Sequence, residues 1–169
     1  PVGVTASLQQ TLRFNNPGKA GDIVDVDLLL PGGIADLTLL GAVTLATYNG
    51  ATFNNDRIAI TNPLITLQVL GGERFRASVV AGANFDRVEI RLGGLATVLT
   101  TANIYQAAYR YPNATITGAA APICDGQTAN LSATSTGGET FQWYDSPTLG
   151  NVVSVAPTAP LTTTTTYYL

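Results

Sequence analysis

The sequence contains no histidine, no methionine and a single cysteine, Cys124. Zinc sites that combine Cys and His ligands, and nucleophilic triads that depend on His, are therefore excluded within this chain. No apolar run reaches the roughly 18 to 20 residues that cross a bilayer as a helix, so we expect no membrane insertion. The chain starts at Pro1 without Met or a charged leader, so we expect any targeting segment to have been removed or to lie outside it.

Charge is scarce as well. Only 11% of the residues are charged, against roughly 25% in typical soluble domains. Eight basic residues stand against eleven acidic ones, and no basic cluster is present to neutralise phosphates, so nucleic acid is not an expected partner. Apolar residues make up 46% of the chain, and 17 Gly and 9 Pro interrupt short runs of β-branched residues. This composition favours strands and turns over helices, with enough apolar residues for a sizeable core.

Residues 1–112 show short apolar segments separated by turn residues, which is typical of a β-sandwich or barrel. In 23–28, Asp25 and Asp27 alternate with apolar residues, and in 85–92 an apolar face of Val88, Ile90 and Leu92 alternates with charged residues. Further strands are expected at 5–14, 37–48, 64–70, 75–80 and 103–111. For the start of segment 37–48, a short helical turn near 34–40 is the alternative.

Residues 113–169 differ because they are almost uncharged, rich in Thr and contain the single Trp. We place the boundary between two modules at Pro112–Asn113, with 119–122 as the alternative. Apolar residues alternate over 129–133, and a Thr-Gly-Gly-Glu turn then leads to Phe141-Gln142-Trp143-Tyr144. We expect 162–168, five Thr followed by two Tyr, to be a strand near the end of this module.

Four ordered motifs of the second half carry a resemblance to a known family. They are Cys-x-Gly-Gln-Thr at 124–128, Phe-Gln-Trp-Tyr at 141–144, Ser-Pro-Thr-x-Gly at 146–150 and Thr-Thr-Tyr-Tyr at 165–168. In this order they resemble the Ig-like repeats of large Bacteroidota cell-surface adhesins. The resemblance implies a secreted protein of the type IX secretion class, at the cell surface, of a kind linked to gliding or attachment.

The first half is similar to the β-sandwich module that precedes such repeats, through Gly21-Asp22-x-Val24-x-Val26 and residues 85–95. The predicted fold is therefore all-β. A jelly-roll-like β-sandwich at 1–112 is followed by an Ig-like β-sandwich at 113–169 that lacks its last strand.

Repeats of this type often carry a second Cys after the Tyr-Tyr strand, and here the sequence stops at Leu169. The resemblance therefore implies that Cys124 forms a disulfide with a partner beyond residue 169. A free thiol and a small buried hydrophobic residue are the alternatives. We also expect the last strand to come from a longer polypeptide or from a neighbouring chain, so self-assembly is a further expectation.

The aromatic residues of the second half have two interpretations. Trp143 beside Tyr144 is expected in the core of an Ig-like sandwich, and stacking on a sugar ring is the alternative. Tyr167 and Tyr168 point to opposite faces, and we assign Tyr168 to the core. The predicted core residues are Trp143, Phe141, Tyr168, Val88, Ile90 and Leu92.

Two groups of oxygen-bearing residues are candidates for calcium, the one metal this sequence suggests. They are Asp22, Asp25 and Asp27 in the first, and Asn54, Asn55 and Asp56 in the second. Ordinary solvated strand faces and turns are the alternative. No other cofactor is expected.

A glycan is the other candidate ligand. Its contacts are predicted at Tyr105, Tyr109, Tyr111, Arg87 and Arg91, and an exposed coplanar pair among these tyrosines and Tyr48 would favour it. Charge pairing of Arg87, Glu89 and Arg91 with Glu73, Arg74 or Arg76 across strands is the alternative.

No spacing in the sequence promotes a pair of catalytic carboxylates or a phosphate-binding loop. We therefore interpret the chain as a non-enzymatic structural or adhesive segment of a modular surface protein, a stalk or filament building block whose partners are neighbouring modules or subunits. A carbohydrate-binding module is the alternative, either of a surface protein or of a polysaccharide-degrading enzyme with its catalytic domain elsewhere; surface polysaccharide would then be the partner.

Overall fold

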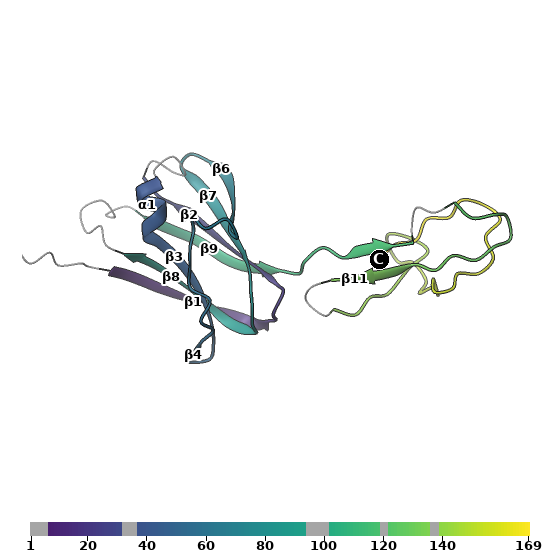
Figure 1. The fold of residues 1–169 in the computed structure, drawn as a ribbon, viewed down its shortest axis with the longest axis horizontal. Helices are drawn as coiled ribbons and strands as arrows, with labels where there is room; N and C mark the ends of the chain where they lie inside the picture. The colour runs from purple at the N-terminus through teal and green to yellow at the C-terminus, as the bar shows by residue number, and fades with distance from the viewer. Residues whose placement is uncertain (1–6, 32–36, 94–101, 119–121, 136–138) are drawn as a thin grey trace, which may run out of the picture. The chain divides into compact units, whose positions relative to one another are not determined.

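A computed structural model describes residues 7–31, 37–93, 102–118, 122–135 and 139–169. The chain divides into two compact units, Pro1–Pro112 and Asn113–Leu169, which are described separately. Strands make up nearly all of the regular structure in both (Figure 1). The predicted all-β fold is therefore confirmed.

Two antiparallel sheets form the first unit (Figure 1). One has the strand order β1-β8-β3-β4, with β5 also pairing with β3, and the other has the order β6-β7-β2-β9. The strands are β1 (Ser7–Gly18), β2 (Ile23–Leu29), β3 (Val43–Asn49), β4 (Thr52–Phe53), β5 (Ile58–Ala59), β6 (Thr66–Gly71), β7 (Arg74–Val80), β8 (Phe85–Gly93) and β9 (Asn103–Arg110). Neighbouring strands mostly come from distant parts of the chain, because the chain crosses repeatedly between the sheets.

The predicted hairpin between β6 and β7 is confirmed. Gly71 and Gly72 have φ values of 95° and 58°, which a glycine adopts without steric cost, and Glu73 follows with φ 61°. The start of β3 follows the alternative, a helical turn, and not the predicted strand from residue 37. Residues 37–42 form the short helix α1 (Leu37–Ala42), and the strand begins only at Val43, where β-branched residues replace the leucines.

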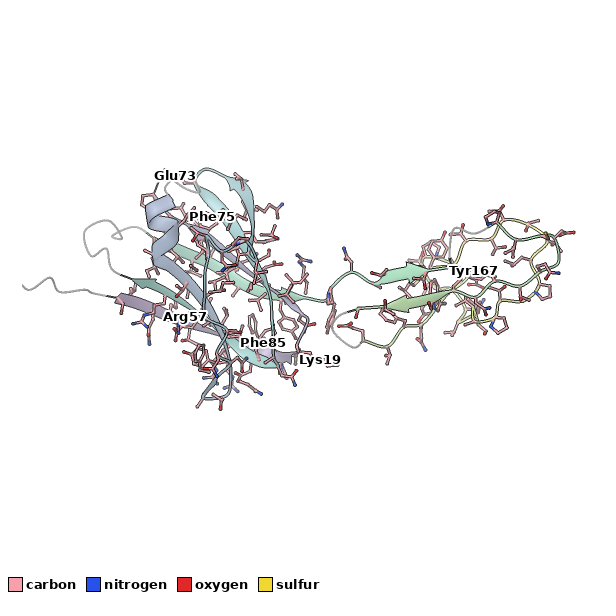
Figure 2. All side chains as sticks on the ribbon, viewed as in Figure 1. Lys19, Arg57, Glu73, Phe75, Phe85 and Tyr167 are labelled. Carbon is pink, nitrogen blue, oxygen red and sulfur yellow. The ribbon has the colours of Figure 1, made fainter. Side chains whose placement is uncertain are left out.

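The core of the first unit lies between its two sheets. Alternating residues of β2, β7 and β8 are buried there with the apolar residues of β3 and the surrounding turns. The fully buried side chains include Val24, Val26, Leu45, Phe75, Phe85, Val88 and Ile90, and Leu92 is almost fully buried. Figure 2 shows Phe75 and Phe85 inside this unit.

The second unit has less regular structure than the sequence predicts. Strands β10 (Thr115–Thr117) and β11 (Ser132–Thr134) pair with each other, and isolated bridges join Gln127 to Leu161 and Tyr144 to both Val152 and Tyr168. The alternation predicted for 129–133 is present, since Leu131 is buried and its neighbours Asn130 and Ser132 are exposed. The predicted strand at 162–168 is wrong beyond the single bridge at Tyr168.

Three aromatic rings close one end of the core in the first unit. Phe85 meets Phe14 and Tyr109 edge to face, with ring centroids 5.6 Å and 5.5 Å apart. Gly18 lies against the same ring, because a Cβ at this position would come within 2.2 Å of Phe85 Cζ. The last residue of β1 must therefore be glycine for the ring to occupy its place.

We expect Gly18→Ala to lower the free energy of unfolding of the first unit by about 1–3 kcal/mol, the usual cost of overpacking a core. Gly82→Ala is the matched control, since no atom lies within 4 Å of a Cβ there, and we expect it to be close to neutral. Urea unfolding followed by circular dichroism measures both. Equal stability of the two variants would contradict the proposed contact.

Candidate functional site

Two aspartates lie on the outer face of the β6-β7-β2-β9 sheet, and both are buried there. Asp27 is 3% exposed and Asp25 is 7% exposed. Arg76 donates to Asp27 through Nε at 2.6 Å and through Nη2 at 3.0 Å, and Gln106 Nε2 donates to the same carboxylate at 2.8 Å. Asp25 accepts from Ser78 Oγ at 2.5 Å and from Arg110 Nε at 3.0 Å. Strands β7 and β9 thus supply the donors from both sides of β2.

These contacts replace the calcium interpretation of Asp25 and Asp27. The side-chain hydrogen bond from Arg76 holds the pKa of Asp27 below its usual value, with Gln106 acting in the same direction against the effect of burial. The carboxylates already have cationic partners, so they have no reason to bind a metal ion. Across the described ranges, no group of three Asp, Glu, Cys or His side chains is placed to hold a metal ion.

Asp22 and the 54–56 loop also have structural roles. Asp22 is buried and its Oδ2 accepts from the Lys19 backbone at 2.8 Å, closing the turn before β2. Asp56 accepts from the backbone N–H of Thr47 at 2.8 Å and from the Thr47 hydroxyl. Asn54 donates to the same hydroxyl at 2.8 Å. Asp56 and Asn54 therefore hold this loop against β3.

The charged residues of β8 do not pair as the sequence suggests. Glu89 accepts from Arg57 Nη2 at 2.6 Å and from the Tyr48 hydroxyl at 3.0 Å, and burial together with Glu89 raises the pKa of Tyr48. Arg87 donates to Asp86 at 2.9 Å, while Arg91 reaches Ser7 at 3.3 Å. Arg74 and Arg76 lie in the other sheet, so the pairing expected with them is wrong, whereas the pairing expected with Glu73 stays a prediction.

The residues predicted to contact a glycan lie in separate places. Tyr109 packs between the sheets against Phe14 and Phe85, whereas Tyr105 is 50% exposed under the guanidinium of Arg74, 4.0 Å from its ring centroid. Tyr111 is 64% exposed, and its ring stands at 83° to that of Tyr109. Arg87 and Arg91 belong to the opposite sheet. The predicted contact set is therefore divided between the two sheets and does not form one surface.

The second unit contains a hollow of about 780 Å³, which we call the Trp143 hollow. Its lining includes Ile116, Cys124, Leu131, Trp143, the Thr162–Thr166 run and Tyr167. Leu131 belongs to the segment that pairs with 155–161, and Trp143 to the segment that pairs with 151–153 and 168. Residues from both of these paired layers therefore border the hollow.

The aromatic core predicted for this unit needs correction. Trp143 and Phe141 are only half-buried, and Tyr168 is 37% exposed. Tyr167, labelled in Figure 2, is the half-buried member of the tyrosine pair and lines the hollow. Tyr168 exchanges two backbone hydrogen bonds with Tyr144. Cys124 is exposed and borders the hollow, and its predicted disulfide with a partner beyond residue 169 stays a prediction.

Sequence reasoning missed both the hollow and the Arg57–Glu89–Tyr48 cluster. The cluster depends on the loop after β3 folding back over β8, which no local pattern reveals. A signal for the hollow was present, since the Thr162–Thr166 run offers no large apolar side chain to fill a core.

Residues 112–169 match the model of a protein family described as Ig-like domain, CHU_C associated. The second unit is similar to an Ig-like domain. This match agrees with the paired layers of the unit and supports a domain of the cell-surface type. No curated protein and no solved structure matches the chain. None of the helices described is long and apolar enough to cross a membrane.

We expect Asp27→Asn to lower the free energy of unfolding at pH 7 by about 1.5–3 kcal/mol, the value of hydrogen bonds to a charged group. Because the folded pKa of Asp27 is lowered, its contribution is present above the unfolded value of about 3.9. That contribution disappears as pH falls from there through the folded pKa, so the variant and the parent should converge in acid.

Urea unfolding between pH 2 and 7, with Asp27→Asn, Arg76→Gln and the double variant, measures this coupling. A double variant that loses the sum of the two single losses would show that the pair does not interact. If the free energies of unfolding of the parent and of Asp27→Asn differ by the same amount at every pH, the assignment of a lowered pKa to Asp27 is contradicted.

Proposed function

We propose that the chain is a non-enzymatic structural segment of a secreted, modular cell-surface protein, and that it serves as a stalk or filament building block. The observation that carries the proposal is the match of 112–169 to the Ig-like family associated with CHU_C. That association links the family to a type IX sorting region of Bacteroidetes, which supports export to the cell surface. The partners are neighbouring modules or subunits of the same protein.

The polar groups of the first unit support this proposal. Asp25, Asp27 and Glu89 are buried in ion pairs and hydrogen bonds, and each has a guanidinium group as a partner. General acid–base catalysis needs a group that can exchange its proton with a substrate within hydrogen-bond reach. Carboxylates held in this way stabilise the sandwich instead, as expected for a module whose task is to be rigid.

The two units also differ in their content of charged residues. All eight basic residues precede residue 111, whereas 113–169 contain only Asp125, Glu139 and Asp145 as charged residues. The second unit therefore carries a net charge of −3 on a surface rich in Thr and Ser. The first unit has eight basic and eight acidic residues and is neutral overall, so the net charge of the chain lies in the second unit, where it favours solubility.

A module exchange in cells of the source organism tests the proposal. Replacing 1–169 of the surface protein by two unrelated β-sandwich domains of similar length should retain surface attachment, because a spacer needs length and rigidity but no particular ligand. Deleting the segment should reduce attachment. A protease added to intact cells should degrade the segment in the parent protein, which would show that it lies at the cell surface. If the exchanged protein reaches the cell surface in the same amount as the parent protein but attachment is lost, the segment itself binds a ligand.

A further inference from the structure

Two bonds of the chain join Asn or Asp to a following glycine, namely Asn49–Gly50 and Asp125–Gly126. At such a bond the main-chain nitrogen of the glycine attacks the side-chain carbonyl carbon of the preceding residue, because glycine has no Cβ that hinders a close approach. For Asn, the new N–C bond closes a succinimide ring and ammonia leaves. Water then opens the ring to Asp or to isoaspartate, in which the main chain runs through the former side chain.

The structure engages the attacking nitrogen at both bonds. Gly50 N–H donates to Asp86 Oδ1 at 3.0 Å, and Gly126 N–H donates to the carbonyl oxygen of Leu161 at 2.8 Å. A nitrogen held in this way is not free to approach the neighbouring side chain. The two restraints differ in kind. The second is part of backbone pairing, since Leu161 N–H also donates to Gln127 O at 2.9 Å, whereas the first depends on a single carboxylate.

The Asn49–Gly50 bond lies in the turn of the β3–β4 hairpin (Figure 1). Asn49 is the last residue of β3, pairs with Thr52 of β4 and is exposed. Gly50 has a φ of 61°, and among the described residues no atom lies within 4 Å of a Cβ at this position. Packing therefore does not shield this bond. Its protection comes from the pairing of the hairpin and from Asp86.

Asp86 is suited to this role because it is both fixed and ionised. Arg87 donates to its Oδ1 from Nε at 2.9 Å and to its Oδ2 from Nη2 at 3.1 Å. The hydrogen bond from Arg87 holds the pKa of Asp86 below its usual value, and the Gly50 backbone acts in the same direction. The attack requires the Gly50 amide to lose its proton. An ionised carboxylate beside it opposes that loss, because two negative charges would then adjoin.

We propose that Asn49–Gly50 is a site of spontaneous covalent modification, and that Asp86 keeps the site closed while the turn lies against β8. When the turn detaches, the Gly50 nitrogen is free to attack. Isoaspartate lengthens the main chain beside a tight turn, so the modified hairpin no longer pairs as before. Detachment of the turn is thereby recorded as a permanent change at one residue. This inference does not depend on the proposed function.

The experiment follows the conversion of Asn49 in the full chain at mildly alkaline pH, by mass spectrometry of the peptide that contains it. Asp86→Ala removes the acceptor. We expect conversion about tenfold to hundredfold faster than in the parent, which corresponds to the loss of one hydrogen bond to a charged group. The chain unfolded in urea gives the upper limit of the rate. Isomerisation of Asp125, whose glycine nitrogen is held by the backbone, should not change.

Two further variants separate the hydrogen bond from a general loss of stability. Phe75→Leu leaves a cavity in the core and alters the other sheet, but it retains the Asp86 contact, so conversion of Asn49 should stay near the parent rate. Asp86→Asn retains an oxygen acceptor, and its rate should lie between those of the parent and Asp86→Ala. Urea unfolding measures the stability of each variant. Hydrogen exchange of the Gly50 amide should rank the variants in the same order as the conversion.

Three results would overturn the proposal. Equal rates in the parent and Asp86→Ala would show that Asp86 does not protect the bond. A slower rate in Asp86→Ala would show that the carboxylate acts as a base that promotes the attack. Equal acceleration by Phe75→Leu and Asp86→Ala would show that stability alone sets the rate. If Asp86→Ala does not fold, Asp86→Asn replaces it in each comparison.

Discussion

Strand β2 is covered on both faces. The stability of the first unit depends on how the two outward carboxylates of this strand are neutralised. Its inner residues Val24 and Val26 have no exposed surface, as expected for a central strand. Asp25 and Asp27 are almost as deeply buried, and a carboxylate in such a place is stable only with charged or hydrogen-bonding partners. Arg76 and Arg110 supply them from β7 and β9.

The same ion pairs fix the register of three strands. A slip of one residue would turn Arg76 or Arg110 into the core and carry an apolar side chain outward. Such a slip would leave a buried carboxylate without its partner, at a cost beyond the lost packing. The described residues of the second unit form no such ion pair, and their core is limited to Leu131, Val155 and Thr158.

Patterns within one segment were predicted well from the sequence. The alternation of Val88, Ile90 and Leu92 and the Gly71–Gly72 turn depend only on neighbouring residues, and each occurs in the structure. Predictions that needed distant contacts failed. The sequence does not reveal that Asp27 lies opposite Arg76, or that Arg57 reaches Glu89, because sheet order decides both. The choice between Tyr167 and Tyr168 failed because alternation identifies two faces without saying which is inside.

The interaction of Arg110 with Asp25 has a consequence for cleavage by proteases. Arg110 is the last basic residue of the sequence, and it is held within the paired strand β9. A protease that cuts after Lys or Arg needs an extended, accessible chain at its target. It finds no target at all in 111–169, and the one nearest to the junction is engaged in a sheet. Cleavage by a trypsin-like enzyme at the junction between the units is thus limited to the bond that follows Arg110.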